Sequence, residues 1–476
     1  MATIYGANTL SSGYDVANSC RFNNDDSPYL SRNMASQGSS IKGSFSAWVK
    51  PSSHNSDKCL MTHYYNNSYF FSIHFQDDNS FMVKDYRTSN IMVYYTSAVY
   101  RDLSSWYNFV VIVDRSLGTA NDRVKIFING TRLTSANSGL TVGAVYDQQT
   151  SGSHSGNHSM NNDYTLEVGR NQALNGDGYM DGYIAEMVWL DGVAKDVTDF
   201  GEFDSNSPTV WKPKDVSGLS SDKGTNGFWL DFEDSSNLGN DAFGGTDFSE
   251  NNIVAADQST DTCTNNFATK NANFQTSTVF TEGALVSTHS SNSWQWSPAS
   301  LAFQNGKWYA EVKVLSHNYS GIGLTDLDDA FGYAPSDTHP GKTAVTPNGR
   351  GFFWYYDDGK IYYNDTSTTG PGSFTTNDIL MFAIDMTNSK YHFGKNGSWL
   401  SSSDPANNSG GFTHQSGGTW TFFDAVGNGG SLSWNYGSPN HSVSSGNADA
   451  NGYGNFEYSV PSGYYTLNSK NLAEFG

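Results

Sequence analysis

The feature that most constrains this chain is a strand pattern that occurs twice. In each copy, a nearly continuous apolar run ends in Asp and is followed by a hairpin closed by Asn-Gly. The copies read WYNFVVIVD…VKIFINGTRL within 106–133 and DILMFAIDM…YHFGKNGSWL within 378–400. Asn-Gly favours a type I′ turn, because both central residues of that turn need positive φ. Uninterrupted apolar runs of this length are typical of strands buried on both faces. We therefore expect two antiparallel sandwiches of related plan.

The predicted fold class is all-β, with two jelly-roll-like antiparallel β-sandwiches joined by an irregular strap. No convincing long helix appears in the sequence. The joining segment is rich in Pro, Asp, Ser and Asn, which allows a flexible linker. Its large aromatic residues, such as Trp211 and Trp229, favour an ordered strap instead. The predicted division of the chain is 1–200, 201–284 and 285–476.

Composition narrows the classes of function. Only 15% of residues are charged, 14% are aromatic, and the formal net charge is -21. So many aromatic residues can fill a large core, which argues against disorder. The surplus of carboxylates repels phosphate backbones, so nucleic acid is not expected as a partner. No apolar run approaches the roughly 18–20 residues of a membrane span, so no membrane insertion is expected.

Cysteine usage and the N-terminus bear on where the protein works. Three scattered cysteines are too few for a disulfide framework and lack metal-ligand spacing. The first residues, MATIYGAN, have neither a basic region nor an apolar core, so no secretory signal is predicted. The Ser-, Asn- and Gly-rich surface nevertheless suggests work outside cells. A protein without a signal could reach that location by cell lysis, as virion components do.

Several stretches carry resemblances to known families. The stretches FSAWVKP at 45–51 and GYMDGYIAE at 178–186 resemble a laminin-G-like, concanavalin A-like lectin/glucanase domain. The stretches GKWYAEV at 306–312 and FGKNG at 393–397 resemble a SPRY (B30.2-like) domain. The pairing of the two, with the intervening segment, resembles structural proteins of marine bacteriophage virions.

These resemblances imply a function. We expect a non-enzymatic virion protein exposed on the particle, made in the host cytoplasm, and serving as a tail fibre or appendage that attaches to host-surface glycans or a receptor. The alternatives are a capsid decoration protein without glycan binding, or a polysaccharide-degrading glycoside hydrolase or lyase. Other virion proteins are expected as partners. A homo-oligomer is also expected, with a trimer among the states considered, because fibres are usually symmetric.

An enzyme of the concanavalin A-like class would need paired carboxylates. Such enzymes resemble one another in a Glu-x-Asp-x-x-Glu strand, whose alternation sets two carboxylates on one face. Glu202 and Asp204 lack the second Glu of that motif. Asp231 and Glu233 share a face if extended, but the sequence favours a surface hairpin edge as their role. No catalytic residue is predicted.

Calcium is the one cofactor considered. Laminin-G-like domains often hold a calcium ion at the sandwich rim, and this ion takes six to eight oxygen ligands. The resemblance points to Asp77 and Asp78, or to Asp177 and Asp181, as ligands. The alternative is that these residues are solvated turn residues.

Glycan binding is expected from aromatic faces flanked by polar groups on loops or strand ends. The densest such stretch is GFFWYYDDGKIYYN at 351–364, where alternation sends neighbouring side chains to opposite faces. Either one face is presented to a ligand, or both faces are buried. The predicted carbohydrate-binding residues are Trp354, Tyr355, Tyr356, Asp357, Tyr64 and Tyr65.

Overall fold

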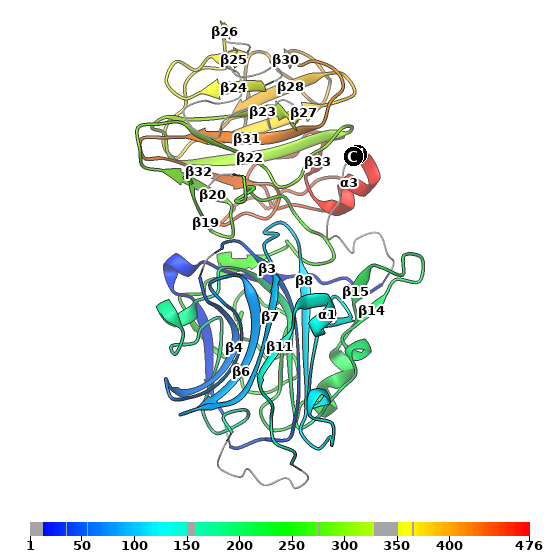
Figure 1. Cartoon of the computed structure of the whole chain (residues 1–476). Helices are drawn as coiled ribbons and strands as arrows, with labels where there is room; N and C mark the ends of the chain where they lie inside the picture. The colour runs from blue at the N-terminus through cyan, green and yellow to red at the C-terminus, as the bar shows by residue number, and fades with distance from the viewer. Residues whose placement is uncertain are drawn as a thin grey trace. The chain divides into compact units, whose positions relative to one another are not determined.

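The predicted all-β class is confirmed by the computed structural model, in which antiparallel sheets dominate (Figure 1). The structure describes residues 13–34, 36–54, 56–149, 158–274, 277–327, 351–363 and 366–476. The chain forms two compact units, one ending at Thr264 and the other running from Asn265 to Gly476. The boundary therefore falls inside the segment 201–284, and residues on its two sides belong to different units.

The first unit is built on two eight-stranded sheets. Sheet A has the order β10 (Thr131–Arg132), β9 (Val124–Ile128), β8 (Tyr107–Asp114), β3 (Lys42–Pro51), β13 (Gly182–Asp191), β1 (Ser19–Phe22) and β18 (Gln258–Ser259), with β16 (Phe228–Leu230) paired to β13. Sheet B has the order β11 (Thr141–Ala144), β7 (Asn90–Val99), β6 (Ser80–Arg87), β5 (Tyr69–Phe75), β4 (Lys58–Asn66), β12 (Thr165–Val168), β2 (Tyr29–Asn33) and β17 (Ser249–Asn251). A separate hairpin joins β14 (Gly201–Phe203) and β15 (Trp211–Pro213).

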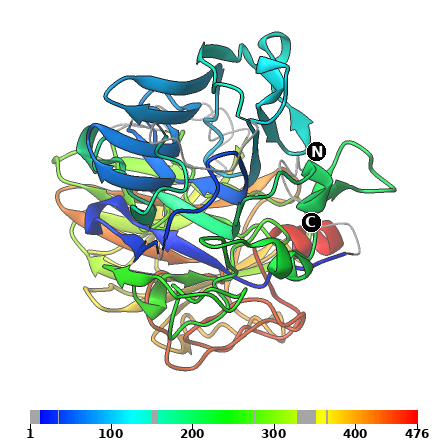
Figure 2. The same cartoon turned by 90° about the horizontal axis from the view of Figure 1, so that it is seen from below.

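Sheet A is buried on both faces. Phe109 and Val111 of β8 point into the core between sheets A and B, whereas Val110 and Ile112 belong to a second apolar cluster on the outer face. That outer cluster also contains aromatic residues of the segment 201–264, drawn in green in Figures 1 and 2. The double burial explains why β8 is apolar at consecutive positions from Phe109 to Val113 rather than at alternate ones. Up to Thr264, the predicted strap is an ordered part of the first unit.

The second unit is also a sandwich of two sheets, with nine and six strands. Sheet G has the order β19 (Val279–Thr281), β20 (Val286–His289), β32 (Gly430–Asn435), β22 (Lys307–Ser316), β27 (Ile379–Asp385), β28 (Lys390–Lys395) and β29 (Ser398–Trp399), with β30 (Phe412–Thr413) on β28 and β33 (Tyr465–Thr466) parallel to β22. Sheet H has the order β21 (Gln295–Pro298), β31 (Trp420–Val426), β23 (Ser320–Asp326), β24 (Gly351–Tyr355), β25 (Ile361–Tyr363) and β26 (Thr366–Thr368).

Helices are few and short in the described part of the chain. The α-helices are α1 (Ser135–Ser138) and α3 (Ser469–Phe475). The 3-10 turns are η1 (Asn24–Asp26), η2 (Ala120–Asp122), η3 (Asn175–Gly178), η4 (Val197–Asp199), η5 (Ser217–Asp222) and η6 (Ala255–Asp257). Among the described residues, no helix has the length and apolar character that crossing a membrane requires. The three cysteines are buried and free of disulfides.

Candidate functional site

The strongest candidate site is a cavity of about 400 Å³ on the outer face of sheet B, over β2, β4 and β12. Alternation along β12 places it there: Leu166 and Val168 enter the core, so Thr165 and Glu167 face outward. In β2, Leu30 is in the core, which turns its neighbours outward in the same way. We call this cavity the tyrosine pocket, because its lining includes Tyr29, Tyr64, Tyr65 and Tyr164.

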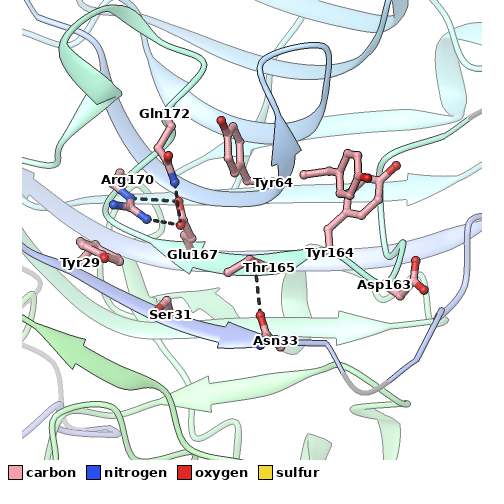
Figure 3. Close-up of a pocket in the computed structure, with 11 residues that line it drawn as sticks. Tyr29, Ser31, Asn33, Tyr64, Asp163, Tyr164, Thr165, Glu167, Arg170 and Gln172 are labelled. Carbon is pink, nitrogen blue, oxygen red and sulfur yellow. Dashed lines mark hydrogen bonds and ion pairs between the residues drawn. The ribbon is translucent and has the colours of Figure 1, made fainter.

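Strand register brings the polar floor of the tyrosine pocket together. Thr165 of β12 lies opposite Asn33 of β2 and Tyr64 of β4, and Glu167 lies opposite Ser31. The hydroxyl of Thr165 donates a hydrogen bond to the amide oxygen of Asn33 at 3.2 Å (Figure 3). Residues from three separate parts of the chain thus form one continuous row across the sheet.

A charged cluster forms one end of the tyrosine pocket. The Arg170 guanidinium donates two hydrogen bonds to the Glu167 carboxylate, and the Gln172 amide donates a third at 3.4 Å (Figure 3). The same guanidinium lies over the ring of Tyr29, 3.5 Å from its centroid. Burial alone lowers the pKa of Arg170, but the hydrogen bonds and charge of Glu167 outweigh that effect and raise it. The ion pair is therefore a fixed, charged feature of the pocket.

Tyrosine rings form the other end. Tyr65 is stacked on Tyr164 with ring centroids 5.1 Å apart, and it remains 63% exposed. The hydroxyl of Tyr64 donates to the side-chain oxygen of Asn67 at 2.8 Å, which holds this ring in place. Burial, and next the charge of Glu167, raise the pKa of Tyr64, so its hydroxyl stays protonated at neutral pH.

This arrangement suits a hydroxyl-rich ligand with apolar ring faces. The tyrosine rings offer flat apolar surface, while Asn33, Thr165 and Gln172 offer donors and acceptors at the floor. It does not resemble an acid–base site. Glu167 is 2% exposed and its oxygens already accept hydrogen bonds from Arg170 and Gln172. The other carboxylate of the lining, Asp163, is exposed to solvent.

Of the predicted carbohydrate-binding residues, only Tyr64 and Tyr65 line the tyrosine pocket. Trp354 is completely buried between sheets G and H, and its indole N–H donates to the carbonyl of Gly372 at 2.9 Å. A surface role for Trp354 is therefore wrong. Tyr355 packs against a second aromatic cluster, on the outer face of sheet H, and Tyr356 packs against the inner core.

Asp357 is exposed and follows the end of β24, outside the two pockets described in this structure. Both faces of β24 are covered, as the alternative interpretation of this stretch expected. The physical reason is that sheet H, like sheet A, carries apolar clusters on each side.

Each predicted metal ligand lies in a turn or loop of the first unit. Asp78 accepts a hydrogen bond from the backbone N–H of Ser80, as a turn residue does. Asp181 is buried, and its carboxylate accepts a hydrogen bond from the hydroxyl of Ser52 at 2.9 Å. Within the described residues, no three His, Cys, Asp or Glu side chains form a group that could hold a metal ion. Asp77 and Asp177 lie in turns on this unit, and calcium binding stays a prediction.

The carboxylate pairs considered for catalysis are also placed. Glu202 lies in β14 and Asp204 directly follows that strand, and both approach the Lys212 ammonium, at 3.2 and 3.5 Å. Asp231 and Glu233 follow β16, where the Asp231 side chain accepts a hydrogen bond from the backbone N–H of Glu233. That bond makes a turn of the segment, so the two carboxylates do not alternate along a strand as the sequence suggested.

Sequence reasoning missed most of the tyrosine pocket. The sequence does not single out Tyr29, Tyr164, Glu167 or Arg170, because Tyr29 lies 35 residues before Tyr64 and the other three lie 100 or more residues after it. The available signal was the pair of short alternating strands at β2 and β12. Their alternation shows which residues face outward, but only the pairing of both strands with each other and with β4 shows that they share a site.

Comparison with known proteins gives a likeness in fold alone. No family model and no curated protein sequence matches this chain. The SPRY domain of human HERC1 is 16% identical, with 32% of this chain and 87% of that chain covered and a TM-score of 0.25. The TRIM65 PSpry domain is 12% identical, with 33% and 85% covered and a TM-score of 0.26. A human SPRY domain is 14% identical, with 36% and 98% covered and a TM-score of 0.26. The laminin-G-like and bacteriophage resemblances stay predictions.

Proposed function

We propose that this chain is a non-enzymatic carbohydrate-binding protein and that the tyrosine pocket is its binding site. The observation that carries the proposal is the row formed by Tyr64, Thr165 and Asn33, next to the stacked rings of Tyr65 and Tyr164. A pyranose ring has one face of C–H groups and a rim of hydroxyls. The tyrosine rings match the first and the polar floor matches the second.

In this proposal the fixed ion pair of Glu167 and Arg170 orients the sugar rather than cleaving it. The buried Glu167 carboxylate holds the Arg170 guanidinium at one end of the floor, so the guanidinium offers N–H donors without needing to be ordered on binding. Neutral, hydroxyl-rich glycans are the expected ligands, because the positive and negative charges of this pair balance one another.

The binding test is a glycan array with the whole chain, followed by titration of the best ligand. We expect Tyr65→Ala to weaken binding about tenfold, which corresponds to about 1.4 kcal/mol of lost ring contact. Glu167→Gln should weaken it as well, by releasing Arg170 from its position. Tyr95→Ala is the matched control: it lies on β7 of the same sheet, next to the core residue Tyr94, and is outside the tyrosine pocket.

Two outcomes would contradict the proposal. The first is that the protein binds no glycan on the array, even when it is presented at high valency. The second is an equal loss of affinity for Tyr65→Ala and Tyr95→Ala. Incubation of the bound polysaccharide with the protein tests the non-enzymatic part, since release of new reducing ends would establish a hydrolase or lyase in its place.

We also propose the setting that the sequence predicts: an appendage on a virion surface, assembled with other virion proteins and with further copies of this chain. Immunogold labelling of intact particles should place the protein at a tail or fibre. Labelling confined to the capsid shell, without glycan binding, would favour the decoration protein. Light scattering of the purified chain gives the number of copies, and a monomer at all concentrations would contradict self-assembly.

A further inference from the structure

A second cavity of the first unit, about 300 Å³, opens where an edge of sheet A meets an edge of sheet B. β10 is the edge strand of sheet A and β11 is the edge strand of sheet B. The chain passes from one to the other through α1, which lies beside β7 (Figure 1). We call this cavity the edge pocket. It is separate from the tyrosine pocket, with which it shares no lining residue.

The inner wall of the edge pocket is apolar. Val124, Ile126 and Leu133 line it and belong to the buried core, and Leu140 packs against them. Val142 of β11 lies at the outside and is 36% exposed. A ligand that packs against this wall buries apolar surface, and such burial is the main source of affinity in small-molecule sites.

One polar group interrupts this wall. Tyr94 of β7 is 1% exposed and lines the edge pocket, and its hydroxyl has no hydrogen-bond partner among the described residues. A buried hydroxyl without a partner costs about 1–3 kcal/mol relative to one that is satisfied. Burial raises the pKa of Tyr94 to about 12, so the hydroxyl carries its proton at neutral pH and is available as a donor.

The mouth of the edge pocket is polar and locally braced. Arg132 is paired with Asp122 at 2.8 Å, and both side chains are exposed. The hydroxyl of Thr134 accepts a hydrogen bond from the backbone N–H of Asn137, which caps α1. The opening is therefore defined by ordered groups, while the apolar wall and the Tyr94 hydroxyl lie further inside.

From this geometry we propose that the edge pocket binds a small, mainly apolar molecule with one hydrogen-bond acceptor, such as a ketone, ester or ether oxygen, which the Tyr94 hydroxyl contacts. The cavity volume is at the lower end of the range for small-molecule sites, about 300–1,000 Å³, so a ligand of one or two rings fits its size. This site does not depend on the proposed glycan binding.

Two probes of nearly equal shape test the proposal: acetophenone, which has a carbonyl oxygen, and ethylbenzene, which has none. Their affinities are measured by titration calorimetry on the whole chain and on Tyr94→Phe. We expect the variant to bind acetophenone about tenfold more weakly and ethylbenzene within twofold of the original chain, because only the hydroxyl is lost. Val142→Trp, which fills the mouth, should weaken both probes at least tenfold.

Absence of saturable acetophenone binding would overturn the proposal, as would equal effects of Tyr94→Phe on the two probes. If Val142→Trp bound both probes as tightly as the original chain, the probes would lie outside the edge pocket, which would also overturn the proposal. Tyr94→Phe should melt no lower than the original chain, since the hydroxyl that it removes has no described partner. Should this variant fail to fold, the Val142→Trp result alone decides whether the probes occupy the edge pocket.

Discussion

Glu186 lies in β13 with a backbone φ of +48°, at the bulge where the pairing of β13 with β3 shifts. Its side chain is 5% exposed, and its carboxyl oxygens accept hydrogen bonds from the Tyr14 hydroxyl at 3.2 Å and the Trp229 indole N–H at 3.1 Å. Burial raises the pKa of Glu186 from 4.5 to about 8, and the charge of Asp231 adds to this effect. The folded chain therefore holds a proton here that the unfolded chain releases.

That proton makes stability depend on pH in a predictable direction. Between about pH 4.5 and pH 8 the folded state binds more protons at Glu186, so the free energy of unfolding falls as pH rises through this window. Glu186→Gln cannot lose a proton. Relative to the original chain, this variant should gain stability steadily from pH 5 to pH 8 and no further above pH 9, as measured by urea titration.

The comparison of the two chains isolates Glu186. Burial raises the pKa of Asp85 to about 6, which also contributes to the pH dependence, but this contribution is common to both chains and cancels in the difference. A difference in unfolding free energy that does not change between pH 5 and pH 9 would contradict the assignment.

At the scale of elements, a buried ion pair fixes the end of the segment 201–264 against sheet A. Lys50 of β3 and Asp261 are each 1% exposed, and their charged atoms are 2.8 Å apart. The same carboxylate accepts a hydrogen bond from the Trp106 indole at 3.0 Å. Removing one partner would leave the other charge buried, which is the costly case for ion pairs in protein interiors.

Lys50→Met should therefore lower the free energy of unfolding of the first unit by about 3–5 kcal/mol. Lys42→Met is the matched control on the same strand. Lys42 forms an ion pair with Asp114 at 3.3 Å, and the Lys42 side chain is 40% exposed. Such a solvated pair contributes about 0–1 kcal/mol. Chemical denaturation of both variants gives the two values, and equal losses would contradict the assigned role of Lys50.

The two Asn-Gly hairpins can be predicted from the sequence, because the preference of these residues for the turn is local. Asn129 and Gly130 have φ values of 48° and 73°, and Asn396 and Gly397 have 49° and 81°. These are the positive values that a type I′ turn needs, and Asn-Gly adopts them at little cost. Local sequence is also sufficient to predict how β8 is buried, because its run of apolar residues from Phe109 to Val113 indicates a strand covered on both faces.

At the scale of the whole molecule, the position of the domain boundary has consequences for fragments. β16, β17 and β18 all lie between residue 200 and Thr264, and each pairs with a strand of the first unit. The outer face of sheet A is covered by the same segment, through residues that include Trp211 and Trp229. A fragment that ends at residue 200 would expose this apolar face to solvent.

We therefore expect fragments 13–264 and 265–476 each to be soluble and to unfold cooperatively, whereas fragment 13–200 should aggregate or bind the dye ANS strongly. Circular dichroism on heating and size-exclusion chromatography distinguish these results. A fragment 13–200 as stable as 13–264 would show that the covering segment adds nothing to the first unit.

The sequence by itself determined the all-β class, the Asn-Gly hairpins and the strands buried on both faces. These follow from alternation, apolar runs and turn chemistry, which act over a few residues. Only the tertiary structure decided which strands are neighbours. The pairing of β2 and β4 with β12 assembled the tyrosine pocket from residues near positions 30, 64 and 167. The tertiary structure of the second unit also covered both faces of β24 and buried Trp354. Burial depends on which other segments pack against a strand, and alternation within that strand does not specify them.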